Sequence, residues 1–113
     1  SNMISRPWLG ISGITLNQES IEQMNLDITA GVYIWDIYPG SPADINSLIA
    51  DSKDGTINGD IIVGIDGLKV TSVSQMVDYL NSLKPMDMVN LKVLRDAELK
   101  QIEIVLGSWP PKN

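Results

Sequence analysis

The chain contains no cysteine and no histidine among its 113 residues. The absence of cysteine excludes disulfide bonds and thiol chemistry, although it does not identify the cellular compartment. The absence of histidine excludes a Ser-His-Asp triad, Cys-His catalysis and the common zinc sites. The chain therefore lacks the side chains on which many hydrolytic active sites depend, and its composition favours binding over catalysis.

Phenylalanine is also absent, so Ile, Leu, Val and Met must build the core. Lys and Arg number 8 against 14 Asp and Glu, which gives a formal net charge of -6. Because the basic residues are few and scattered, we predict no nucleic-acid partner. No apolar run is long enough to span a bilayer, so we predict no membrane insertion by this segment. The length suits one domain with a modest core.

Apolar periodicity, turn residues and helix caps predict the order strand, strand, short helix, strand pair, long helix, hairpin. Strands are expected at 8–16, 31–37, 60–65, 68–70, 89–93 and 101–106, and helical segments at 18–24, 43–49 and 72–83. This order predicts an α+β, mainly β fold. We expect a partly open antiparallel barrel or sandwich of five to six strands, capped by two helices.

The longest predicted helix begins after Ser72, a favoured cap, and ends at Lys84-Pro85. Its apolar residues follow the i, i+3, i+4 spacing of one helix face: Val73, Met76, Val77, Leu80 and Leu83. We therefore expect Met76 and Leu83 to lie in the core.

The segment Arg6-Pro7-Trp8-Leu9-Gly10-Ile11 is the most informative part of the chain. A glycine between two large apolar residues permits a tight turn that leaves a row of N–H groups directed at one point. Such a nest of amides binds anions, including the terminal carboxylate of a peptide. If the long helix packs beside the strand that follows, the two elements form a groove for an extended peptide.

Four motifs in this order resemble a PDZ domain, and more narrowly the PDZ domains of HtrA/Deg-type serine proteases. The motifs cover nearly the whole chain and are Arg6–Ile11, Pro39–Ala43, Gly59–Gly67, and Leu83–Pro85 with Val93–Asp96. The chain departs from that family after the first helix. The family often has Ala-Gly-Leu there and then runs quickly into Gly-Asp, whereas here an acidic loop up to Asn58 intervenes.

The resemblance implies that Leu9, Gly10 and Ile11 offer backbone N–H groups to a peptide's terminal carboxylate. Arg6 would add positive charge to the same site, directly or through water, and Trp8 belongs to the same loop. The strand that starts at Ile11 would pair with the peptide as an added strand.

The resemblance also implies a groove formed by the strand and by the helix face beside it: Ser12, Gly13, Ile14, Val73, Val77 and Leu80. Leu9 and Ile11 would join Val77 and Leu80 in walling an apolar pocket for the last side chain of the peptide. An apolar Val73 would favour an apolar residue two positions before the peptide terminus.

In this interpretation residues 1–5 are an expression remnant or linker, residues 6–107 are the PDZ domain, and residues 108–113 are a C-terminal tail. The parent protein would be an HtrA-like serine endopeptidase whose catalytic domain lies upstream, outside this chain. Its location would be extracytoplasmic, either periplasmic or membrane-anchored at the cell surface. Its partners would be peptide or unfolded-protein C-termini and its own protease domain, in a parent that could be homo-oligomeric. We expect no cofactor.

Other functions remain open at this stage. The domain could belong to another membrane-linked protease or to a secretion component, or it could be a scaffold for oligomer assembly. A standalone hydrolase acting through Asp44, Asp60 and Asp66 is a further alternative, but nothing in the spacing of these carboxylates pairs them for acid–base work.

Two smaller features complete the sequence picture. Asp51-Ser52-Lys53-Asp54-Gly55 weakly resembles a calcium loop, but a lysine stands at a ligand position and the downstream glutamate is missing, so we expect no metal site.

Of Tyr33 and Trp35, we expect one to be buried and the other exposed. The exposed aromatic residue is a candidate contact for a protease domain.

Overall fold

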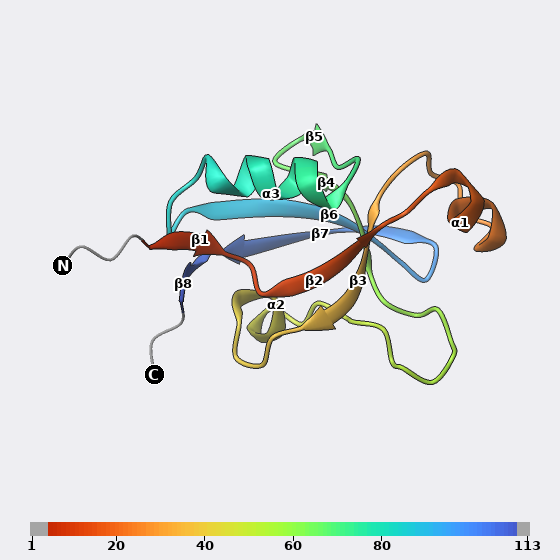
Figure 1. Ribbon diagram of the computed structural model, residues 1–113, viewed down its shortest axis with the longest axis horizontal. Coiled ribbons are helices and arrows are strands. Elements are labelled where there is room, and N and C mark those ends of the chain that lie inside the picture. The colour runs from red at the N-terminus through yellow and green to blue at the C-terminus, as the bar shows by residue number, and fades with distance from the viewer. Residues whose placement is uncertain (1–4, 111–113) are drawn as a thin grey trace.

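The computed structural model describes residues 5–110 and contains a six-stranded antiparallel sheet with a helix packed against it (Figure 1). The strands are β1 Arg6–Trp8, β2 Ile11–Thr15, β3 Val32–Ile37, β4 Ile61–Ile65, β5 Leu68–Lys69, β6 Met88–Arg95, β7 Glu98–Val105 and β8 Gly107–Trp109. The helices are α1 Gln18–Gln23, α2 Pro42–Ile45 and α3 Val73–Asn81.

The sheet has the order β2-β3-β4-β6-β7, with β5 paired to β4, and β1 and β8 form a separate pair. Because β2 and β7 lie at opposite edges and do not pair with each other, the sheet stays open. The predicted α+β, mainly β class and the partly open arrangement are therefore confirmed.

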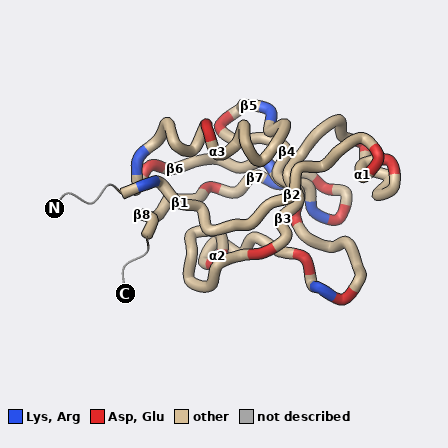
Figure 2. The backbone as a smooth tube through the Cα atoms, viewed as in Figure 1, with Lys and Arg blue, Asp and Glu red and all other residues tan. Residues whose placement is uncertain are grey.

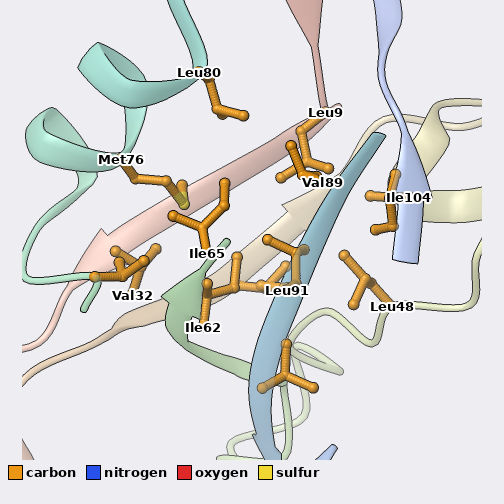
Figure 3. Close-up of a cluster of buried hydrophobic side chains, with 14 of the residues drawn as sticks. Leu9, Val32, Leu48, Ile62, Ile65, Met76, Leu80, Val89, Leu91 and Ile104 are labelled. Atoms are coloured by element: carbon orange, nitrogen blue, oxygen red, sulfur yellow. The ribbon is translucent and has the colours of Figure 1, made fainter. Parts of the chain in front are cut away.

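The main core lies between α3 and the sheet (Figure 3). Met76 and Leu80 point from α3 into this core, and Leu83 packs against it, as the helical spacing predicts. Val77 differs, because 42% of its surface remains exposed. The apolar stripe of α3 is therefore wider than the core needs, and it leaves one apolar side chain free to contact something else.

Side chains cap all three helices at the positions that the sequence indicates. Asn17, Ser41 and Ser72 accept hydrogen bonds from backbone N–H groups three residues downstream. Helix α2 is shorter than predicted and ends at Ile45 rather than near Ile49, because Ser47 adopts a φ of 63° that a helix cannot continue through.

The apolar stretch from Trp8 to Leu16 is two strands rather than the one strand predicted. The chain leaves β1 at Trp8, turns at Leu9-Gly10 and resumes as β2 at Ile11.

The expected tail also begins later than residue 108, since Ser108 and Trp109 pair with Pro7 and Arg6. The local pattern could not reveal this pairing, because β1 and β8 are separated by almost the whole chain. Residues 1–4 and 111–113 of the predicted linker and tail lie outside the described residues.

A β-bulge in β3 separates the two neighbouring aromatic residues. Asp36 pairs with Ser12 and Ile34 pairs with Gly13, so Trp35 has no partner in β2. Tyr33 is buried and Trp35 is half-exposed, as expected. Residues two apart on a regular strand share a face, so the bulge explains why the environments of these two differ.

Asp60 is fully buried at the start of β4 and forms a two-point ion pair with Arg95. The Nε and Nη2 atoms of Arg95 donate to the two carboxylate oxygens at 2.8 and 2.7 Å. The N–H of Ile49 also donates to Asp60, at 2.9 Å. The pair therefore ties the chain after α2 to the end of β6, and Asp60 has a structural role.

Replacing Asp60 by Asn is expected to lower the free energy of unfolding by about 3 kcal/mol, because it leaves Arg95 charged and half-buried without its partner. The double variant with Arg95→Met should lose less than the sum of the two single losses, since it removes both charges. Glu98→Gln is the control, because Glu98 forms an exposed pair with Lys100 at 3.9 Å, which contributes little. Equal losses for Asp60→Asn and Glu98→Gln in chemical denaturation contradict the argument.

Tyr33 anchors the acidic loop between Asp51 and Asn58. Its hydroxyl donates to Asp51 Oδ1 at 2.5 Å and accepts from the N–H of Gly59 at 3.0 Å. Burial and the hydrogen bond to Asp51 raise the pKa of Tyr33 above its usual value of 10.0. The folded state therefore favours the neutral phenol.

Because that pKa is raised, the resulting stability is complete below pH 10 and is lost as the pH rises through the pKa of the folded state. We expect the free energy of unfolding to fall with pH above 10, and to fall less steeply in Tyr33→Phe. Tyr79, whose pKa is also raised by its hydrogen bond to Asp66, accounts for a remaining slope. Identical slopes for the variant and the parent chain would show that Tyr33 contributes nothing.

Candidate peptide-binding site

Strand β2 lies at one edge of the sheet, with β3 on one side and no strand on the other. Helix α3 follows this open edge, and the two elements meet at one end. There the N–H of Val73 donates to Thr15 Oγ1 at 2.9 Å. A Cβ placed on Gly13 would lie 3.5 Å from Val73 Cγ2, so this part of β2 faces the helix. Together the two elements form the sides of a groove beside an unpaired strand edge.

Hydrogen bonds also hold helix α3 on the side that faces away from β2. Tyr79 donates to Asp66 Oδ2 at 2.5 Å, and Asp66 Oδ1 accepts from the N–H of Asn90 at 2.8 Å. These bonds join the helix to the turn after β4 and to β6. The width of the groove is therefore determined by contacts on both sides of α3.

The loop before β2 has its carbonyl groups engaged and its N–H groups free. The N–H of Ala43 donates to Leu9 O at 3.0 Å, and the N–H of Tyr38 donates to Gly10 O at 2.8 Å. Within residues 5–110, the N–H groups of Leu9 and Gly10 donate to no protein acceptor. This is the arrangement expected of an anion-binding nest.

The same hydrogen bonds determine the direction of Ile11. Because Gly10 and Tyr38 form a hydrogen-bonded pair, the next pair along the ladder, Ile11 and Ile37, is non-hydrogen-bonded. The N–H and C=O of Ile11 therefore point to the open edge of β2. Three consecutive N–H groups are thus available at the head of the groove.

Gly10 permits this turn for two reasons. Its φ is +91°, a conformation that side chains disfavour, and an added Cβ would lie 2.1 Å from Ser41 Cβ. Ser41 is itself fully buried and caps α2. Glycine at this position therefore lets the loop pack against the start of α2.

A cavity of about 630 Å³ opens at this loop. Of the residues that the sequence assigned to the carboxylate site or groove, five line it: Arg6, Trp8, Gly10, Ile11 and Ser12. The other lining residues are Pro7, Asp36, Ile37, Tyr38, Pro39, Asn81 and Trp109. The cavity therefore joins the loop, the strand edge and the last turn of α3.

The remaining predicted residues divide between the core and the groove surface. The side chains of Leu9 and Leu80 are buried and do not line the cavity. Val73 is partly buried against the core, whereas Val77 and Ile14 are exposed. Leu9 thus contributes its backbone to the loop and its side chain to the core.

An aromatic cluster beside the loop was missed by the sequence reasoning. Trp8 lies 5.1 Å from Tyr38 and 5.3 Å from Trp109 between ring centroids, and Tyr38 lies 6.1 Å from Trp109. Trp8 and Trp109 meet because β1 pairs with β8, and Tyr38 joins them because its N–H donates to Gly10 O in the adjoining loop. The aromatic residues beside Pro7, Pro39 and Pro110 were the only available signal, and they do not reveal their mutual contact.

The basic residues are dispersed along the described chain and do not gather on one face (Figure 2). Among residues 5–110, no helix is long and apolar enough to cross a membrane. In the same range, no group of three or more acidic side chains is placed to hold a metal ion.

A sequence profile of the PDZ domain family matches residues 7–106. The chain therefore belongs to the PDZ domain family. Over nearly its whole length it is also homologous to one part of DegP/HtrA-type serine proteases. The expected family and fold are thus confirmed.

Two relatives illustrate this homology. A probable periplasmic serine endoprotease, DegP-like, from Halomonas elongata is 31% identical over 107 residues, which cover 95% of this chain and 21% of the relative. Protease Do-like 1, chloroplastic, from Arabidopsis thaliana is 31% identical over 113 residues, which cover 97% of this chain and 25% of the relative. The chain thus spans between a fifth and a quarter of the length of these proteins.

Solved structures agree with this assignment. The HtrA-type protease AlgW, solved with a decapeptide, matches with a TM-score of 0.76 at 25% identity, over 96% of this chain and 31% of that one. The PDZ domain of HtrA3, solved with a phage-derived ligand, matches with a TM-score of 0.70 over 93% of this chain and 88% of that one. At 20% identity the second match shows the fold alone.

Gly10→Ala is expected to destabilise the domain more than Gly40→Ala, by roughly 1–3 kcal/mol, the usual cost of overpacking. Both glycines have a positive φ, but a Cβ at Gly40 would meet nothing within 4 Å. The difference in unfolding free energy between the two variants therefore isolates the contact with Ser41. Equal losses in chemical denaturation would show that only the backbone conformation matters.

Proposed function

We propose that this domain captures the C-terminus of an extended peptide as an added strand on β2. The observation that carries the proposal is the free N–H row at Leu9, Gly10 and Ile11, at the end of an unpaired strand edge. A terminal carboxylate supplies the acceptors that these groups lack. Arg6 lines the same cavity and adds a positive charge near the carboxylate.

The geometry of β2 determines how the peptide lies. With its carboxylate at the loop, the peptide runs antiparallel to β2, so its last residue lies beside Ile11 and the third from the end lies beside Gly13. Both side chains then point toward α3. Val77, which is exposed on α3, contacts the last side chain, and Val73, which lies beside Gly13, contacts the other. Apolar residues are therefore preferred at both peptide positions.

The expected affinity is modest. One buried apolar side chain contributes about 1.5–3 kcal/mol, and strand pairing adds to it. Association and ordering of the peptide offset a large part of this gain. We therefore expect a dissociation constant in the micromolar range, which corresponds to a binding free energy of about -8 kcal/mol.

The domain itself is non-catalytic, and its role is recognition. We propose that the parent protein is a serine endopeptidase of the HtrA type, because the homologous proteins are described as serine endoproteases. The domain then delivers exposed C-termini to the protease domain or regulates it. Several relatives are described as periplasmic, which favours an extracytoplasmic parent. A membrane anchor and a homo-oligomeric parent remain predictions.

The test compares peptides that end in apolar residues as free acids with the same peptides as C-terminal amides. We expect the free acids to bind in the micromolar range by titration and the amides to bind much more weakly, because an amide lacks the charged acceptor. Equal binding of both forms would mean that the groove takes internal segments. If neither form binds at millimolar concentration, peptide capture is wrong and the scaffold function becomes the better explanation.

Val77→Ser tests the groove without disturbing the core. Its side chain is 42% exposed in the free domain, so the variant should fold normally. Binding of an apolar peptide should weaken roughly fivefold, about 1 kcal/mol, through the loss of apolar contact. Val105→Ser is the matched control, since Val105 is 48% exposed on β7, at the far edge of the sheet. Equal effects of the two variants on affinity would remove Val77 from the groove.

A further inference from the structure

The outer face of β2 should contact the penultimate residue of the peptide, an inference that rests on the proposed function. Side chains alternate between the faces of a strand. Gly13 faces α3, since a Cβ there would meet Val32 and Val73. Ser12 therefore faces the opposite side, and the peptide residue that lies beside Ser12 directs its side chain there as well. That peptide residue is the one before the last.

The residues on this outer face of β2 and β3 form a surface that the penultimate side chain can contact. Ser12 pairs with Asp36 across the β2–β3 ladder, and both line the cavity that opens at the loop. Tyr38 and Trp109, whose rings are half-exposed, line the same cavity. A side chain that leaves the peptide backbone beside Ser12 thus meets one carboxylate and an aromatic surface.

The Asp36 carboxylate is available for a ligand. Its side chain is 68% exposed and forms no hydrogen bond within residues 5–110. Its nearest cation, Lys53 Nζ, lies 3.7 Å away, at the outer limit of an ion pair.

Lys53 is held mainly by other groups. Its Nζ donates to Trp35 O at 2.6 Å and lies 4.3 Å from the centroid of the Trp35 ring. The bulge at Trp35 provides this position, so Lys53 neutralises Asp36 only in part.

We propose that Asp36 selects a basic penultimate residue, arginine above all, in the peptides that this domain binds. The apolar stem of an arginine covers the Tyr38 ring, and its guanidinium reaches the Asp36 carboxylate. The formal net charge of -6 favours a basic ligand over an acidic one at longer range. A neutral aromatic residue would use the rings but would leave Asp36 without a partner.

Arg6 does not neutralise the Asp36 carboxylate. Although both line the cavity, no ion pair joins them in the described part of the chain. Arg6 belongs to β1, opposite Trp109, whereas Asp36 belongs to β3. The cavity therefore offers a positive group for the terminal carboxylate and, apart from it, a negative group for the preceding side chain.

The experiment uses the whole chain and four free-acid peptides that differ only in the penultimate residue, which is Arg, Gln, Glu or Trp. Titration should rank Arg first and Glu last, with Arg bound about threefold more tightly than Gln, as expected for an exposed charge pair. Asp36→Asn should abolish the preference of Arg over Gln. Glu103→Gln, on β7 at the far edge, makes the same change in net charge and should preserve the preference.

Each other outcome overturns the proposal. A preference for Arg that survives Asp36→Asn, or that falls equally in Glu103→Gln, would come from net charge rather than from Asp36. Tighter binding of the Trp peptide than of the Arg peptide would assign the position to the aromatic cluster. Equal binding of all four free acids would refute Asp36 as a selector and leave carboxylate capture intact. Capture itself fails only if the free acids and their amides bind alike or not at all.

Discussion

Two backbone hydrogen bonds determine the geometry of the peptide site. The N–H groups of Ala43 and Tyr38 engage the carbonyls of Leu9 and Gly10, so the amides of the same loop point outward. A row of unpaired N–H groups is unfavourable without a partner, and a carboxylate supplies one. The donors come from α2 and from the end of β3. The site therefore depends on the packing of α2 under the loop, which only glycine at position 10 permits.

The rest of the fold keeps the groove at a constant width. Thr15 joins the end of β2 to the start of α3, and Tyr79 joins the back of α3 to Asp66. The buried pair of Asp60 and Arg95 fixes the chain that leaves α2. These contacts keep β2 and α3 in position while the edge of β2 stays unpaired. A preorganised strand edge reduces the ordering that binding requires, which suits a module of modest affinity.

Under the proposed function, the two faces of β2 contact different residues of the peptide. Toward α3, apolar side chains such as Val77 would bury alternate peptide side chains. On the other face, the bulge at Trp35 and the β1–β8 pair bring Asp36 beside an aromatic cluster. The pairing of β1 with β8 also joins the loop to Trp109, near the C-terminal end of the described chain.

The sequence by itself determined the local features: the caps at Asn17, Ser41 and Ser72, the buried stripe of α3, and the loop at Gly10. Such features depend on residues within one or two turns of each other, which a single sequence displays. Tertiary structure decided the remainder. The pairing of Trp109 with Arg6, the cluster around Trp8 and the ion pair of Asp60 with Arg95 join residues that are far apart in the chain, and no local pattern specifies such partners. The bulge that exposes Trp35 likewise follows from the register between β2 and β3, because a register belongs to two strands and not to either one alone.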